Sequence, residues 1–260
     1  MSQERKSKRQ ERRAKIVQKE KRSRLVTIGL VTLGAALLVF AVVWPQLRPV
    51  AQVVAVDPGT HPNPKDNSIG DPNAPIKIEE FADFQCPFCE RFHQDTEPLL
   101  KQYYIDTGKV QYIFRSMDNF VSDNIAKQQG TPATTESQDA AAAAYCAGDQ
   151  NKFWDMHAYL FANALGEDAG SYTDKRLAAI AEKAGLDMDQ FNSCYSSGKF
   201  KDRVQQDAQD GQAAGVTGTP AFIITYTVNG ETKTDRIDGA EQFSTFQQKL
   251  EAALNEIGAQ

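Results

Sequence analysis

The sequence predicts an α/β domain with the element order βαβ, a helical insert and ββα, behind a single transmembrane helix. Three observations support this prediction. Residues 25–44 form an uncharged, apolar run long enough to cross a bilayer. A strand pattern leads directly into a C-x-x-C motif and a helix, and a second alternating strand follows. An Asn-Gly pair at 229–230 joins two further strands ahead of a C-terminal helix.

The first 24 residues are strongly basic, although the whole chain carries a net charge of -5. They contain eleven Lys and Arg against three Glu, whereas the remaining residues contain 18 Lys and Arg against 31 Asp and Glu. A basic head on an acidic body suggests nucleic-acid binding or membrane topology. The apolar run decides for topology, because basic residues gather on the cytoplasmic side of a membrane helix. We therefore expect a cytoplasmic tail at 1–24, no nucleic-acid partner and an extracytoplasmic domain.

The apolar run at 25–44 is predicted to be a signal anchor. A helix of this length spans the ~30 Å hydrocarbon core of a bilayer, and Trp44 ends it at headgroup level. A cleaved signal peptide is the alternative, but its apolar core is normally only ~7–15 residues long. We favour an uncleaved anchor, and hence a single-pass protein of the cell membrane. Five prolines at 45–70 predict a linker, in which 51–56 is a candidate edge strand.

Residues 71–257 are expected to form one folded domain, because about 190 residues are enough for a core. The expected elements are strands at 76–81, 109–116, 221–228 and 231–237 and helices at 87–107, 136–147, 152–165, 173–184, 188–195, 200–214 and 241–257. The helices from 136 onward belong to an insert at about 118–214, which separates the strand–helix–strand unit from the C-terminal hairpin and helix.

Cys86, Pro87, Phe88 and Cys89 form the C-x-x-C motif directly after the first strand. If Pro87 opens the helix, Cys86 lies at its amino end, where free N–H groups and the helix dipole stabilise a thiolate. Cys86 then acts as the nucleophile, and Cys89, one turn further along, resolves the mixed disulfide. A C-x-x-C pair between a strand and a helix is typical of a redox-active site.

Two other roles for the C-x-x-C motif stay open. It is half of many zinc sites, and His93 would supply a third ligand, but the sequence has no second closely spaced pair. The motif could also be a purely structural disulfide. All four cysteines follow the apolar run, and an even number in an oxidising compartment favours disulfides over metal ligation. We therefore predict no metal site, and we predict His93 to be a partly exposed helix residue.

Glu80 and the pair Thr219-Pro220 are further candidate site residues. Glu80 shares a strand face with Ile76 and Ile78, so burial behind the cysteines would raise its pKa and let it exchange protons with Cys89. An ordinary strand-end charge is the alternative. Pro220 opens a strand, and a cis bond there would leave the backbone of Thr219 free to pair with an extended peptide. A trans loop proline is the alternative.

These motifs together resemble the thioredoxin fold, and the insert and the anchor narrow the resemblance to membrane-anchored bacterial DsbA-like thiol-disulfide oxidoreductases. The resemblance covers residues 70–257, and GDPNAP (70–75) followed by IKIEEFADFQCPFC is very similar to the opening of that family's catalytic domain. It implies that Cys86 is the attacking cysteine, Cys89 the buried one and Glu80 the buried acid. It also implies that Pro220 is a cis-proline facing the disulfide, preceded by Thr219.

The resemblance also implies partners and a second cysteine pair. Family members oxidise or rearrange the cysteines of exported proteins, and a membrane quinone-linked reductase of the DsbB or VKOR type reoxidises them. Cys146 and Cys194 are expected on two helices of the insert, and some relatives have a structural disulfide of this kind; two separate buried thiols are the alternative. One departure is Phe88, where the best-known members carry His, so the oxidising power is not implied.

The sequence thus leads to a main hypothesis and two alternatives. The main hypothesis is a membrane-anchored oxidase of exported proteins, with Pro87, Phe88, Thr219 and Pro220 facing the substrate. A disulfide isomerase or reductase on the same scaffold is the first alternative, and a non-redox binding or chaperone module is the second. No cofactor is expected, and a monomer is expected because no dimerisation domain is present.

Overall fold

The computed structural model describes residues 19, 21, 23–41, 43 and 50–258, which belong to two separate compact units divided after Val50. In the first unit, the helix Ser23–Ala41 has a mean hydropathy of 2.1 and is long and apolar enough to cross a membrane. The apolar helix expected at 25–44 overlaps this helix, and its role as an anchor stays a prediction. Trp44 and most of the predicted basic tail at 1–24 lie outside the described residues.

The second unit is built on a mixed five-stranded sheet with the strand order β1-β3-β2-β4-β5. The strands are β1 (Ser68–Ile69), β2 (Ile76–Ala82), β3 (Val110–Ser116), β4 (Ala221–Val228) and β5 (Glu231–Asp238). β2 and β3 are parallel, and the other neighbours are antiparallel. Because β2 is central, its inward residues are buried, and Glu80 lies between Phe114 of β3 and Phe222 of β4. The α/β class and the predicted βαβ–insert–ββα order are confirmed.

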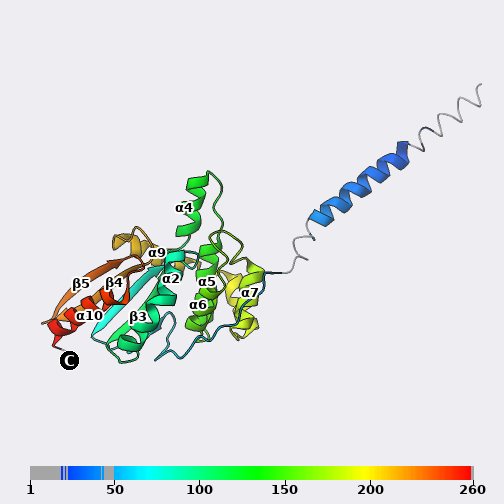
Figure 1. Cartoon of the computed structure of the whole chain (residues 1–260). Helices are drawn as coiled ribbons and strands as arrows, with labels where there is room; N and C mark the ends of the chain where they lie inside the picture. Colours follow the sequence, from blue (N-terminus) through cyan, green and yellow to red (C-terminus); the bar gives the residue numbers. More distant parts are fainter. Residues whose placement is uncertain (1–18, 20, 22, 42, 44–49, 259–260) are drawn as a thin grey trace, which may run out of the picture. The chain divides into compact units, whose positions relative to one another are not determined.

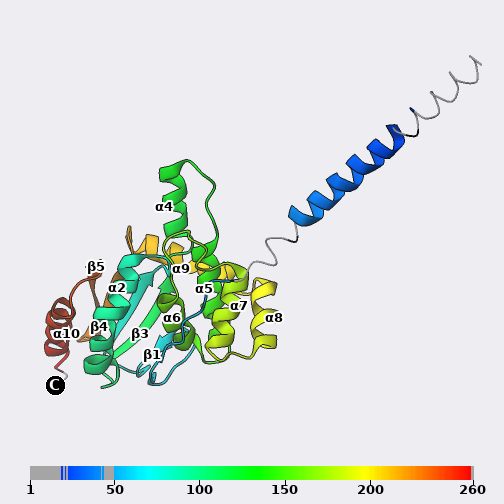
Figure 2. The same ribbon diagram turned by 45° about the vertical axis from the view of Figure 1, so that its right-hand side comes forward.

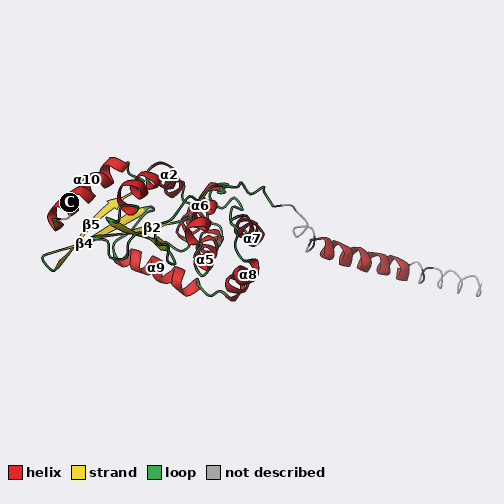
Figure 3. Cartoon of the chain, turned by 90° about the horizontal axis from the view of Figure 1, so that it is seen from below, coloured by secondary structure: helices red, strands yellow, loops and turns green. Residues whose placement is uncertain are grey.

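Helices cover both faces of this sheet. They are α2 (Pro87–Asp95), α3 (Glu97–Leu100), the π-helix η1 (Lys101–Ile105), α4 (Phe120–Gln129), α5 (Glu136–Gly148), α6 (Phe153–Ala162), α7 (Asp174–Lys183), α8 (Met188–Ser197), α9 (Lys201–Ala213) and α10 (Phe243–Ile257). Figure 3 shows α2 and α10 on one side of the sheet and α9 on the other. Gly211 lets α9 approach β2, since an added Cβ there would lie 2.7 Å from a ring carbon of Phe81.

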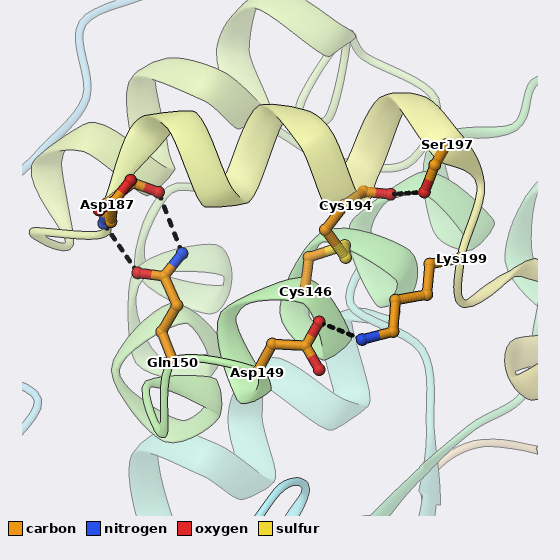
Figure 4. Close-up of a disulfide and its surroundings, with 7 residues drawn as sticks. All are labelled: Cys146, Asp149, Gln150, Asp187, Cys194, Ser197 and Lys199. Carbon is orange, nitrogen blue, oxygen red and sulfur yellow. Dashed lines mark hydrogen bonds and ion pairs between the residues drawn. A yellow bond between two sulfur atoms is a disulfide. The ribbon is translucent and has the colours of Figure 1, made fainter.

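The helical insert is organised around α5. This alanine-rich helix packs against α4, α6, α7, α8 and α9, which is possible because alanine side chains allow helices to approach on several sides. Figures 1 and 2 show α5, α6 and α7 gathered beside the sheet. Cys146 of α5 and Cys194 of α8 are joined by a disulfide, across which the two Cα atoms are 5.8 Å apart (Figure 4).

Two local predictions differ from the structure, and one helix has no counterpart among the predicted elements. The helix expected at 87–107 is broken at Thr96 into α2, α3 and η1, because Pro98 has no N–H to continue the ladder of α2. Residues 51–56 form no strand; the backbone of Val54 instead exchanges two hydrogen bonds, of 2.7 and 3.0 Å, with the side-chain amide of Asn163. α4 was not predicted, since its residues show little amphipathic pattern.

The expected linker at 45–70 is also shorter than predicted. The compact unit begins at Ala51 rather than at residue 71, because Val53 and Val56 pack against the core and Ser68 and Ile69 form β1. The composition of this stretch predicts a linker, but Val53 and Val56 pack against the hydrophobic core of the domain. Only tertiary contacts make it part of the fold.

Candidate active site

The C-x-x-C motif lies at the junction of β2 and α2, as its position in the sequence predicts. Cys86 is the N-cap of α2 in extended conformation, with φ −72° and ψ 119°, and Pro87 is the first helical residue. Proline fits there because its missing N–H would have no partner in the first turn. The N–H groups of Phe88 and Cys89 therefore point toward the Cys86 sulfur, and both lower the pKa of its thiol.

Cys86 ionises far more readily than an ordinary cysteine. Its pKa is lowered to about 6, first by a hydrogen bond with the Cys89 side chain and then by the Thr219 side chain, against the opposing effect of burial. In the thiol form, Cys86 Sγ lies 3.4 Å from the carbonyl oxygen of Thr219. Cys86 is nearly buried, with 5% of the residue exposed. A partner thiol therefore has to approach Cys86 along a narrow direction.

Cys89 has the opposite character. It is fully buried on α2, and its pKa is raised well above the ordinary value, first by burial and then by the hydrogen bond with Cys86. Both cysteines are free thiols in this structure, which therefore represents the reduced pair. At neutral pH the reduced pair holds one proton, on Cys89, and one negative charge, on Cys86.

Glu80 is buried in the sheet below the cysteines, as the strand alternation predicts. Only 1% of it is exposed, and its carboxylate accepts a 2.6 Å hydrogen bond from the Tyr112 hydroxyl. Burial, and then the negative charge of Glu97, raise the pKa of Glu80 to about 8, against the lowering effect of Tyr112. Glu80 is therefore mostly protonated at neutral pH, and once it ionises at higher pH its negative charge raises the pKa of Cys89 further.

Sequence reasoning missed a second buried acid, Asp83. Its carboxylate accepts hydrogen bonds of 2.8 and 2.9 Å from the backbone N–H groups of Gln85 and Val121, and burial raises its pKa to about 7. The Asp83 carbonyl also accepts from the N–H of Cys86 at 3.0 Å. Asp83 therefore holds the turn that presents Cys86. An acid just after a strand and three residues before the motif is the signal that could have indicated it.

Gln85 ties the same turn to the helical insert. Its side-chain Nε2 donates hydrogen bonds of 2.8 Å to the hydroxyls of Ser122 in α4 and Ser137 in α5. Its side-chain Oε1 accepts a hydrogen bond of 2.6 Å from the backbone N–H of Asp168. The side chain is 4% exposed. No short sequence pattern predicts this contact, because the partners are 37, 52 and 83 positions away.

Pro220 and Phe88 complete the surroundings of Cys86. The Thr219–Pro220 bond is cis, and Pro220 is buried directly before β4. Phe88 is 54% exposed, and the guanidinium carbon of Arg91 lies 5.1 Å from the centre of its ring. The structure thus brings Cys86, Cys89, Thr219 and Pro220 together, with Glu80 buried nearby. Their roles in catalysis stay predictions.

We expect the substitution Glu80→Gln to stabilise the protein increasingly as the pH rises. A carboxyl group with a pKa near 8 when folded and 4.5 when unfolded binds more protons in the folded state, so stability falls between these two pH values. Glutamine removes this penalty, which reaches about 3 kcal/mol at pH 7, and its amide oxygen can still accept from Tyr112. Urea unfolding near pH 5 and near pH 8 measures the effect.

Glu79→Gln is the matched control for this measurement. Glu79 precedes Glu80 in β2 but faces the other way, where it pairs with Lys77 at 2.8 Å and Arg115 at 2.9 Å. Its substitution is expected to give no stabilisation at either pH. A Glu80→Gln stabilisation of equal size at both pH values would contradict the raised pKa.

Comparison with known proteins agrees with this geometry. A family model described as Thioredoxin matches residues 62–251. The chain belongs to the thioredoxin family. The crystal structure of Wolbachia pipientis alpha-DsbA1 superimposes with a TM-score of 0.61 at 26% identity, covering 76% of this chain and 94% of that one. A putative protein-disulfide oxidoreductase of Rickettsia felis is 28% identical over 217 residues, which are 82% of this chain and 69% of that relative.

Another relative is much longer than this chain. The Na(+)/H(+) antiporter NhaA 1 of Salinispora arenicola is 29% identical over 172 residues, which are 66% of this chain but only 22% of the antiporter. The chain therefore spans about a fifth of that protein's length. The thioredoxin-like fold and the resemblance to DsbA-like proteins are confirmed by the family model and by the Wolbachia structure. The Rickettsia relative is named a putative protein-disulfide oxidoreductase.

Proposed function

We propose that the thioredoxin-family domain introduces disulfides into exported proteins through Cys86 and Cys89. The observation that carries this proposal is the contrast between the two thiols, since Cys86 has a pKa of about 6 and Cys89 has one raised well above the ordinary value. A stabilised Cys86 thiolate favours the reduced state of the pair, which makes the disulfide state a better oxidant.

The proposed reaction transfers two electrons from a substrate dithiol to the Cys86–Cys89 disulfide. A substrate thiolate attacks Cys86 Sγ, the bond between the two cysteines breaks, and Cys89 leaves with the electron pair. Glu80, protonated at neutral pH, can supply the proton that Cys89 takes up. The second substrate thiolate then attacks the substrate sulfur of the mixed disulfide. Cys86 leaves as a stabilised thiolate, and the substrate keeps the new disulfide.

Substrate recognition is proposed at the surface around Cys86. Pro87 and Phe88 are exposed beside the sulfur, and an exposed aromatic ring offers apolar contact to an unfolded chain. Thr219 lies next to Cys86 at the cis bond, where its backbone can pair with an extended peptide. A loosely defined contact of this kind suits an enzyme that acts on many sequences.

The remaining parts of the proposal concern location and partners. The helix Ser23–Ala41 is proposed to anchor the chain in the cell membrane with its amino end in the cytoplasm and the domain outside. A membrane reductase of the DsbB or VKOR type, linked to quinone, is proposed to reoxidise the pair, and the domain is proposed to act as a monomer.

The reduction potential of the pair tests the direction of electron transfer. In thioredoxin, the attacking cysteine has a pKa of ~7 and the pair has a reduction potential of ~−270 mV. In DsbA, the attacking cysteine has a pKa of ~3.5 and the pair has a reduction potential of ~−120 mV. Interpolation to the pKa of about 6 for Cys86 predicts roughly −230 mV. The reduction potentials of structural disulfides lie below about −300 mV. A Cys86–Cys89 pair at roughly −230 mV would therefore favour formation of such a disulfide by roughly 200-fold.

The measurement is equilibration of the full chain with glutathione redox buffers, followed by trapping of the free thiols. A value at or above the predicted potential agrees with the oxidase. A potential at or below that of thioredoxin would overturn the oxidase and favour the reductase. An unchanged cellular function after Cys86→Ser would instead favour the non-redox binding module.

A further inference from the structure

All three histidines of the chain lie in the domain, and two of them meet one carboxylate in its interior. His93 is in α2, Glu97 opens α3, and His157 is in α6. One ring nitrogen of each histidine and a carboxylate oxygen of Glu97 lie within 4.8 Å of one another. His93 Nδ1 and Glu97 Oε2 are 2.9 Å apart. None of these three side chains takes part in the bond changes proposed for the cysteines, although the charge of Glu97 contributes to the raised pKa of Glu80.

His157 has an unused nitrogen atom in this cluster. The residue is 1% exposed, and its Nε2 has no hydrogen-bond partner among the described residues. The rings of Phe84, Phe114 and Phe161, with centres 5.7, 5.3 and 4.9 Å away, offer no acceptor or donor. The rings of His93 and Trp154, both with centres 4.9 Å away, carry nitrogen atoms but make no hydrogen bond to His157 Nε2. A buried polar atom without a partner costs about 1–3 kcal/mol, so an atom left in this state calls for an explanation.

The three side chains carry the donor atoms that a transition-metal ion needs. Each imidazole offers a ring nitrogen, and Glu97 offers a carboxylate oxygen. The Glu97 carboxylate supplies the negative charge of the cluster, with its Oε2 2.9 Å from His93 Nδ1. Glu97 is 8% exposed, so its negative charge is largely shielded from water.

We propose that His93, Glu97 and His157 form a binding site for a divalent transition-metal ion of the Zn²⁺ type. Two imidazole nitrogens and one carboxylate oxygen are a donor set that Zn²⁺ accepts, with a water molecule as the fourth ligand. Ligand atoms around a tetrahedral zinc ion lie about 3.3 Å apart, so small side-chain movements would close the present 4.8 Å spread. Hard cations such as Mg²⁺ prefer oxygen ligands and fit this set less well.

The proposed metal site can be reached from the surface, and it lies where α2 contacts α6. The His93 side chain is 22% exposed, so an ion can reach the cluster from the surface of α2. The ion would link α2, which begins beside Cys86, to α6 of the insert, because the ligands come from both sides of that contact. The proposed site shares no residue with the cysteine pair.

Zinc titration of the full chain in detergent tests the proposal by calorimetry. The Cys86–Cys89 pair is first oxidised so that its sulfur atoms cannot ligate the ion. One equivalent of Zn²⁺ is expected to bind, and the visible spectrum of bound Co²⁺ is expected to report nitrogen and oxygen ligands. The variants His157→Phe and Glu97→Gln are expected to weaken binding by about 100-fold or more, because each removes one of three protein ligands.

His61→Phe is the matched control. His61 also has two buried ring nitrogens without a hydrogen bond, and it contacts Trp154 with the ring centres 6.2 Å apart, but it lies outside the three-ligand cluster. Its removal is expected to leave zinc affinity unchanged. Thermal unfolding in the absence of zinc shows that each variant is folded.

Three results would overturn the proposal. One is the absence of stoichiometric zinc binding by the oxidised wild type. The second is retention of wild-type affinity by folded His157→Phe. The third is equal weakening by His61→Phe and His157→Phe. In each case His93 and Glu97 are a buried ion pair beside a neutral histidine, and the disulfide chemistry is untouched.

Discussion

The substitution Cys86→Ser is expected to reduce disulfide transfer to a reduced substrate protein by at least about 10³-fold. A serine hydroxyl cannot form a disulfide, so neither the oxidised pair nor the mixed disulfide can exist. The variant should nevertheless fold, because Cys86 makes no side-chain capping bond and the change in stability is expected to stay below about 1 kcal/mol. Oxidative refolding of a reduced model substrate measures the loss.

Cys89→Ser is the matched control, since it removes the other sulfur and leaves Cys86 in place. This variant is expected to keep a reactive thiolate, with alkylation of Cys86 half-maximal in the mildly acid range, because the introduced hydroxyl can donate the hydrogen bond that the Cys89 thiol supplies. It should accumulate mixed disulfides with substrates, because no second cysteine can resolve them. If Cys86→Ser transferred disulfides faster than Cys89→Ser, Cys89 would be the residue that reacts with substrate, and the two assigned roles would be reversed.

Removing the Cys146–Cys194 disulfide is expected to lower the free energy of unfolding by about 4 kcal/mol. The bond joins residues separated by 48 positions, and the chain-entropy model gives about this value for a loop of that length. The double variant Cys146→Ala and Cys194→Ala avoids burying new polar atoms, which matters because Cys146 is 2% exposed. Guanidinium unfolding of both oxidised proteins measures the difference.

Gln150→Ala separates the cross-link from the local contacts around it. Gln150 donates a 3.0 Å hydrogen bond to the Asp187 carbonyl and accepts one of 2.7 Å from the Asp187 N–H, close to the disulfide (Figure 4). Because this pair is exposed, its loss is expected to cost about 1 kcal/mol. A double-cysteine variant no less stable than Gln150→Ala would mean that the cross-link contributes little through the unfolded chain.

Several features of the site could be predicted because they depend on local patterns. Alternation along β2 places Glu80 on the buried face, and Pro87 marks the start of α2, so the position of Cys86 follows from neighbouring residues. The apolar run after the basic tail indicates a membrane helix by length alone. The hairpin at Asn229 follows from the turn chemistry of the Asn-Gly pair.

Other features depend on residues that are distant in the sequence. The break in the helix after Asp95 does have a local signal, which is Pro98. The hydrogen bonds between Val54 and Asn163 have none, because these residues are 109 positions apart. The Asp83 carboxylate finds its second N–H donor at Val121, and the pKa of Cys86 depends partly on Thr219, 133 positions away. No window of the sequence contains both members of these pairs.

The α/β class, the order of the elements, the apolar helix and the position of the C-x-x-C motif follow from the amino-acid sequence alone. These depend on periodicity and turn chemistry within a few residues of each position. Three other features depend on how the chain folds in space. They are the acids that surround the cysteines, the small exposed fraction of Cys86 and the meeting of His93, Glu97 and His157. The physical reason is that burial and charge set a pKa or a ligand site through neighbours in space, and folding alone chooses those neighbours.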